Sequence, residues 1–168
     1  MSLFQKLRSV SRQEFKSALE ELSSVPKDEA IGLLEQLAND LSGVLRSRAV
    51  DGLVIISPDR AEALSIEQLN DPEPGVRVNA VHALWQLHSM TSAAMIARVL
   101  ATDADEITRS WAAFSLGDLG DATVVPILVT AADQDIGVDH EGRPIRDIAL
   151  GAIKMIGSRL ADRSNLST

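Results

Sequence analysis

The sequence predicts an all-α fold, a solenoid of about four to five helix pairs, on the basis of three observations. Hydrophobic residues make up 45% of the 168 residues and aromatic residues only 3%, which suits helix-on-helix packing better than a β-sandwich. One residue pattern recurs at steps of 31 and 32 residues. Within each copy the apolar residues follow helical spacing, as in Val76, Ala80, Leu84 and Leu87.

The repeated pattern is clearest in the segments DLSGVLRSRAVDGLVII, DPEPGVRVNAVHALWQL and DADEITRSWAAFSLGDL. In each segment an Arg follows the first Asp by six residues, an Ala follows the Arg by three, and a Leu follows the Ala by four. A fourth copy aligns if five extra residues are allowed between its Asp and its Arg. The four pairs are Asp40 and Arg46, Asp71 and Arg77, Asp103 and Arg109, and Asp135 and Arg146.

The first helix pair is expected upstream of the clear repeats. Ser11 and Glu14 have the spacing of a capping box, which predicts a helix that runs to about Ser24. Pro26 marks a turn, and KDEAIGLLEQLA follows as the partner helix. Still earlier, MSLFQKLRSV has apolar residues at helical spacing and is expected either to cap the end of the solenoid or to mediate self-association.

In the later units each Asp–Arg segment is expected to form a first helix. The second helices are expected in DRAEALSIEQL, TSAAMIARVL and DATVVPILVTAA. A last helix is predicted near 144–156, followed by a polar tail that frays. The predicted organisation is one domain, 1–168, with a divergent N-terminal unit 1–38, repeats 39–70, 71–102 and 103–134, and a C-terminal capping unit 135–168.

This pattern resembles the HEAT-like repeats of the phycobilisome-lyase (E-Z) type over about 37–157. The most similar copy is ITRSWAAFSLGDLGDATVVPIL, with Gly117, Leu119, Gly120 and Asp121 at the positions that the repeat type favours. Trp85 departs from the pattern, because it stands where the next copy has a Gly. The resemblance implies a right-handed αα-superhelix in which the Asp and Arg residues form a ladder along one ridge and hold the register between repeats.

The five extra residues of the fourth copy are a candidate binding element. They lie in DQDIGVDHEGRPIRDIAL, where Asp139, His140, Glu141 and Arg143 are expected on a loop between two helices. Binding residues commonly lie on loops that a rigid scaffold holds. A loop that is merely tolerated is the alternative. A metal site is not favoured, because neighbouring residues on one loop rarely converge on one ion without more distant ligands.

Trp111 and Phe114 are the second candidate binding element. They lie three residues apart on one helix face, at positions that are mostly polar in the flanking units. Trp is a frequent anchor of protein interfaces, so we expect the pair to contact a partner. In the alternative interpretation both rings pack against adjacent helices or under the long loop. Trp85 is expected to fill space between repeats.

Charge and missing motifs narrow the function. The net charge of −8 and the pI of about 4.8 disfavour nucleic acid and favour a protein partner that is possibly basic. The sequence has no Cys, no phosphate-binding glycine loop and no nucleophile elbow, so we expect no enzyme activity, no cofactor and no metal. Acidic residues gather in the N-terminal third, at Glu20, Glu21, Asp28, Glu29, Glu35, Glu62 and Glu67.

We therefore predict a non-catalytic protein–protein interaction module, an adaptor or scaffold. It is expected to be cytoplasmic, without a membrane segment, and a monomer or weak homodimer. One alternative is an acidic immunity or inhibitor protein that neutralises a basic toxin or nuclease. A second alternative, which the resemblance suggests, is a lyase-like protein that handles a tetrapyrrole such as a bilin.

Overall fold

The computed structural model describes residues 2–9 and 11–165 of the chain. Helices account for 76% of the structure, and no strand occurs in the described part. The helices are α1 (Leu3–Leu7), α2 (Arg12–Leu22), α3 (Lys27–Ala38), α4 (Gly43–Ile56), α5 (Pro58–Gln68), α6 (Pro74–Gln86), the short 3-10 helix η1 (Met90–Ser92), α7 (Ala93–Thr102), α8 (Glu106–Leu119), α9 (Val125–Gln134) and α10 (Ile145–Asn165).

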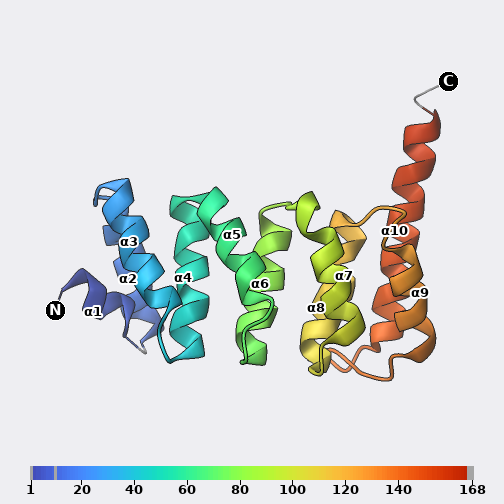
Figure 1. The fold of residues 1–168 in the computed structure, drawn as a ribbon, viewed down its shortest axis with the longest axis horizontal. Coiled ribbons are helices and arrows are strands. Elements are labelled where there is room, and N and C mark those ends of the chain that lie inside the picture. Colours follow the sequence, from blue (N-terminus) through green and yellow to red (C-terminus); the bar gives the residue numbers. More distant parts are fainter. Residues whose placement is uncertain (1, 10, 166–168) are drawn as a thin grey trace.

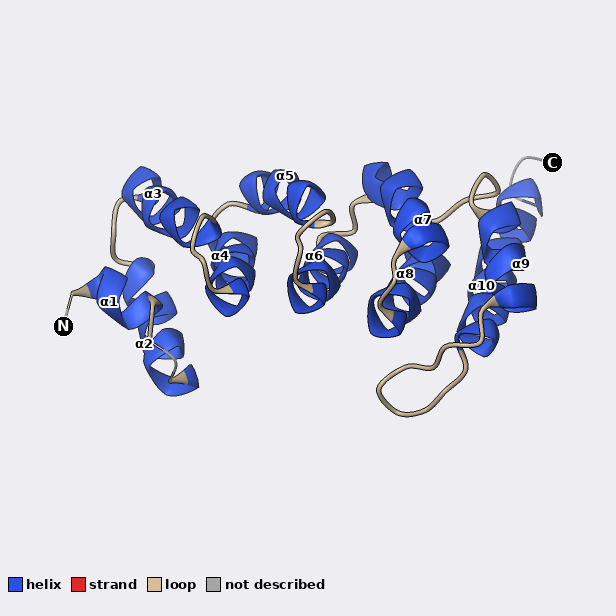
Figure 2. Ribbon diagram, turned by 60° about the horizontal axis from the view of Figure 1, so that its bottom comes forward, coloured by secondary structure: helices blue, strands red, loops and turns tan. Residues whose placement is uncertain are grey.

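The helices form two rows that run along the molecule (Figures 1 and 2). One row consists of α3, α5, α7 and α9, and the other consists of α2, α4, α6, α8 and α10. Helices α4, α6, α8 and α10 pack in sequence along their row, and each of α5, α7 and α9 packs against a helix of that row. This arrangement confirms the predicted all-α solenoid of HEAT-like helix pairs.

Close packing between the units depends on small residues at one repeated position. Ala49, Ala80, Ala112 and Ala149 are all completely buried. A methyl side chain at this position lets neighbouring helices approach one another closely. Around these alanines the core consists almost entirely of Leu, Ile and Val side chains, as the composition predicts.

The N-terminal end is capped differently from the prediction. The Ser11 hydroxyl does accept the backbone N–H of Glu14, at 3.3 Å, and α2 begins there. The Glu14 carboxylate does not complete the capping box, because it accepts a hydrogen bond from the Ser9 hydroxyl instead. The reciprocal box forms at α1, between Ser2 and Gln5. Helix α1 packs on α2 through the fully buried Leu7. Val10, the last apolar residue of the first decapeptide, lies outside the described residues.

The C-terminal helix is longer than predicted. Helix α10 continues to Asn165, so the prediction of a frayed tail beyond residue 156 was wrong. Arg159 explains the extension, because its guanidinium donates to the carbonyl oxygens of Gly117 and Gly120, the latter at 2.7 Å. These carbonyls lie at the end of α8, where no helical N–H remains to bond them and where a cation is favoured.

Candidate interaction surface

The repeated Asp and Arg residues form a ladder between consecutive units. Each Arg binds the Asp of the next unit through two hydrogen bonds of 2.6 to 3.0 Å. We call these three pairs the ladder: Arg46 with Asp71, Arg77 with Asp103, and Arg109 with Asp135. The third guanidinium nitrogen donates to the backbone carbonyl of the Asp in the same unit, at 2.9 to 3.0 Å.

The ladder carboxylates are bound on all sides. Besides the Arg, each accepts a backbone N–H from two residues further along the chain, at 2.9 Å. Hydrogen bonds from Arg46 lower the pKa of Asp71, and those from Arg109 lower the pKa of Asp135. Burial opposes this effect at Asp103, but the bonds from Arg77 still lower the pKa of that carboxyl. No ladder group is left to bind a ligand.

The two ends of the ladder differ from its middle. Asp40 is paired with Arg8 at 2.8 Å instead of with an Arg of a preceding repeat. Arg146 is exposed, and its recorded ion pair is with the neighbouring Asp147, at 3.9 Å. Asp135 and Arg146 therefore do not pair with each other, because Asp135 is held by Arg109 and the described chain has no further unit with an Asp for Arg146.

Four aromatic rings from α6 and α8 form one cluster. His82 contacts Trp85 and Trp111, with centroid distances of 5.7 and 5.0 Å. Phe114 contacts the same two tryptophans, at 5.5 and 5.7 Å. The contacts thus close a ring of four side chains, with mostly tilted or edge-to-face geometries that aromatic pairs favour.

The members of the cluster differ in what holds them. Trp85 is half-buried, and its indole N–H donates to the Asp118 carboxylate at 2.7 Å, which ties α6 to α8. Trp111 is also half-buried and packs on the core. Phe114 keeps 41% of its surface exposed. Trp85 and Trp111 therefore support the cluster, and Phe114 offers its ring to solvent.

The loop before α10 has a defined structure built around Asp139. Its carboxylate accepts the backbone N–H groups of Glu141 and Arg143, both at 2.9 Å, and the Arg143 guanidinium at 2.9 to 3.0 Å. Val138 and Pro144 form an isolated antiparallel bridge at the base. Gly142 has a φ of 81°, a left-handed conformation that glycine adopts without strain. The loop is therefore a small closed turn.

The loop and the aromatic cluster meet at one cleft of about 140 Å³, which we call the aromatic cleft. All six residues predicted to contact a partner line it: Trp111, Phe114, Asp139, His140, Glu141 and Arg143. Asp139 needs a correction in role, because it is only 5% exposed and its carboxylate is used within the loop. The side chains of His140, Glu141 and Arg143 are exposed at the rim.

The hollow surface continues from the cleft along the same row of helices. A second cavity of about 210 Å³ shares Trp111 with the cleft and adds His82 and Asn79. A third, of about 390 Å³, shares Asn79 and reaches Arg48 and Phe15 on α4 and α2. In Figure 2, α2 at one end and the loop at the other project from this side of the molecule.

His82 is the residue of this surface that sequence reasoning missed. It occupies the position of Phe114 one repeat earlier, 32 residues before it, so the repeat alignment contains the signal. Among the described residues, no group of three His, Asp or Glu side chains is placed to hold a metal ion. Within the same residues, no helix combines the length and the apolar character needed to cross a membrane.

Comparison with known proteins agrees with the fold. Residues 62–141 match the family model for HEAT repeats. No curated protein matches the chain. The finer resemblance to the phycobilisome-lyase repeat type is not confirmed. The matched residues, together with the paired helices and the repeated Asp–Arg contacts, support a HEAT-like repeat protein.

Proposed function

We propose that this chain is a non-catalytic protein-interaction module, an adaptor or scaffold, that holds a protein partner at the aromatic cleft. HEAT repeats are commonly protein-interaction modules. The observation that carries the proposal is the exposed Phe114 ring, which is held by the half-buried Trp111 and stands beside a loop of fixed shape. Rigid aromatic residues at the centre of a cleft are typical anchors of protein interfaces.

The rim adds polar groups around this apolar centre. His140, Glu141 and Arg143 lie on the loop side of the cleft, and Asp118 lies beside Trp85. An apolar core with a polar rim is the usual composition of a protein interface. The aromatic cleft therefore suits a partner that inserts one apolar side chain and makes hydrogen bonds around it.

The test compares binding by the wild type with binding by two variants. Proteins captured from a lysate by the tagged chain are identified, and the affinity of each purified candidate is then measured. We expect Phe114→Ala to weaken a partner's binding by about tenfold or more, as for an interface anchor. A second variant lacks Val138 to Gly142, which restores the six-residue spacing between Asp135 and Arg146 and removes the loop wall.

Val129→Ala is the matched control, because Val129 is an exposed apolar residue on α9, in the other row of helices. It should leave the affinity unchanged. If every partner binds Phe114→Ala and the loop deletion as tightly as the wild type, the aromatic cleft is not the binding site and the proposal fails.

A second candidate function is the neutralisation of a basic protein. The net charge of −8 favours it, as do the acidic side chains on α2, α3 and α5. Attraction of a basic partner to such a surface would speed association and weaken steeply as salt is added. An affinity that hardly changes between low and physiological salt would argue against this function.

A further inference from the structure

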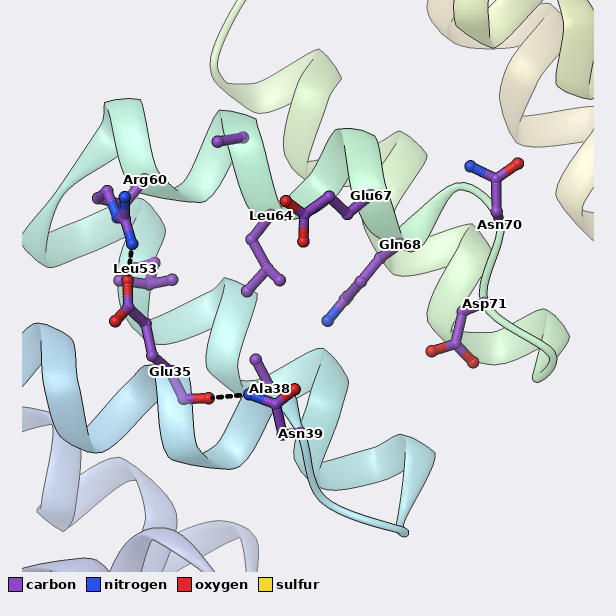
Figure 3. A pocket seen from close by; sticks show the side chains of 11 residues that line it. Glu35, Ala38, Asn39, Leu53, Arg60, Leu64, Glu67, Gln68, Asn70 and Asp71 are labelled. Carbon is purple, nitrogen blue, oxygen red and sulfur yellow. Dashed lines mark hydrogen bonds and ion pairs between the residues drawn. The ribbon is translucent and has the colours of Figure 1, made fainter.

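A groove on the other row of helices has a chemistry of its own. It has a volume of about 400 Å³ and is lined by α3 and α5, with Glu35 and Asn39 on one side and Leu64, Glu67 and Gln68 on the other (Figure 3). None of these residues lines the aromatic cleft. The groove can therefore bind a ligand independently of the surface described above.

The amide donors of this groove are already used. The side-chain nitrogen of Asn39 donates to the Glu35 carbonyl oxygen at 2.9 Å, and that of Gln68 donates to the Arg46 carbonyl oxygen at 3.1 Å. A backbone carbonyl can only accept a hydrogen bond, so these contacts fix which amide atom is nitrogen in each side chain. The amide oxygens are therefore left as acceptors.

Two acceptors in the groove have no donor. Gln68 is only 5% exposed, and its Oε1 accepts no hydrogen bond within the described structure. A buried acceptor without a partner destabilises the fold by about 1–3 kcal/mol. Glu67 is exposed and makes no ion pair with any described residue. Figure 3 shows both side chains on the α5 side, with Gln68 pointing toward Asn39 across the groove.

The surroundings also favour a cation. Helices α3 and α5 end at Ala38 and Gln68, so the negative ends of two helix dipoles lie at the groove. Arg60 already places one guanidinium here, in an ion pair with Glu35. The groove thus accommodates a planar cation at one end while Glu67 and Gln68 remain available at the other.

We propose that this groove binds an arginine side chain of a basic protein segment. A guanidinium carries only donors, and its planar fork can reach a carboxylate and an amide oxygen together. The net charge of −8 attracts such a segment at long range. The site is separate from the aromatic cleft, so it extends the proposed function without depending on it.

The test uses the full chain and three labelled hexapeptides in which glycine alternates with arginine, lysine or glutamine. Binding is followed by fluorescence anisotropy at physiological salt. We expect the arginine peptide to bind most tightly and the glutamine peptide not to bind. Glu67→Gln and Gln68→Met should each weaken the arginine peptide about three- to tenfold, the loss of one charge-assisted hydrogen bond.

Glu29→Gln is the matched control, because it removes the same charge from the first turn of α3, away from the groove. It should change the affinity by less than about twofold, as expected for a distant exposed charge. Equal losses in Glu29→Gln and Glu67→Gln would reduce the binding to net charge and overturn the proposal. Equal affinity for the arginine and glutamine peptides would also overturn it.

A measurement on the wild type protects the test against misfolded variants. The side-chain amide of Gln68 gives its own NMR signals, and these should shift when the arginine peptide is added. Unchanged Gln68 signals at saturating peptide would place the peptide elsewhere and end the proposal. Phe114→Ala should bind the arginine peptide like the wild type, which separates this site from the aromatic cleft.

Discussion

Arg109 and Trp111 lie two residues apart on α8, but their side chains differ in how completely they are engaged. Arg109 donates to the Asp135 carboxylate and to the backbone carbonyl of Asp103, and little of it faces solvent. Trp111 leans on the core and borders the aromatic cleft, next to the exposed Phe114. The same helix therefore carries one saturated position and one open position.

The difference follows from the repeat itself. The ladder positions hold the same residues in successive units, and all of them make the same contact with the next unit. The positions of Trp111 and Phe114 hold different residues in each unit, for example Asn79 and His82 in the preceding one. Contacts that every unit needs select one residue type, so binding residues are to be sought where the units differ.

Acid should produce the largest effect, because it acts on the whole ladder at once. The pKa values of Asp71, Asp103 and Asp135 lie below the ordinary value of 3.8 in the folded chain. Their contribution to stability is therefore complete above the unfolded value and is lost as the pH falls through the folded values. We expect the urea midpoint to drop steeply below about pH 4.

The variant Asp103→Asn separates the ladder from the other carboxylates in this experiment. It lacks one of the three titrations, so its urea midpoint should be lower at neutral pH and should fall less on acidification. If the wild type and Asp103→Asn lose stability in parallel from neutral pH to about pH 3, the ladder carboxylates do not cause the acid sensitivity.

Breaking one rung should give the next largest effect. Arg77→Met keeps the aliphatic stem but leaves Asp103, whose side chain is 6% exposed, without its cation. We expect unfolding free energy to fall by about 3 kcal/mol, as for a mostly buried ion pair that loses one partner. Arg146→Met changes the same repeat position where no rung forms, and should cost less than about 0.5 kcal/mol. Similar losses in both variants would contradict the comparison.

Within the aromatic cluster, Trp85 should behave more like a ladder residue than like a binding residue. It contacts two rings and donates to Asp118 at 2.7 Å. Trp85→Ala should lower the unfolding free energy by about 2 kcal/mol, because it removes a half-buried ring from between two helices. Urea unfolding measures this loss. A stability equal to that of the wild type would show that the ring does not join α6 to α8.

The regular part of the fold was predictable because its signals are local. Apolar spacing identifies each helix, and the six residues between Asp and Arg are fixed by the start of each first helix. The partners within the ladder were less accessible, since Arg77 binds an Asp 26 residues away and not the one six residues before it. Only the stacking of units in space decides between these two carboxylates.

The aromatic cleft was predictable in its residues but not in its assembly. The repeat alignment isolates Trp111, Phe114 and the insertion as departures, yet says nothing about their distance in space. The loop is folded back by hydrogen bonds to Asp139, which precedes the left-handed Gly142 by three residues. An Asp before a Gly at a chain reversal is a turn signal that was available in the sequence.

Loop geometry should have a smaller effect on stability than either helix contact. Gly142→Ala forces a side chain into a left-handed conformation, at a cost of about 1 kcal/mol. The loop should open locally, so amide hydrogen exchange should speed up at Glu141 and Arg143, whose N–H groups bond to Asp139. Gly157→Ala, in open space within α10, is the control and should leave exchange in the loop unchanged. Protection that survives Gly142→Ala would mean that the loop does not depend on this turn.

Phe114→Ala should have the smallest effect on stability and thereby sharpens the comparison most. The ring is 41% exposed, and its two ring contacts are with residues that remain held by other groups. We expect a loss of less than about 1 kcal/mol in urea unfolding, well below that of Trp85→Ala. A loss as large as that of Arg77→Met would mean that Phe114 is a structural residue, and the contrast between the ladder and the aromatic cleft would no longer hold. A small loss accompanied by weaker partner binding would instead identify Phe114 as a residue whose contribution is made at the interface.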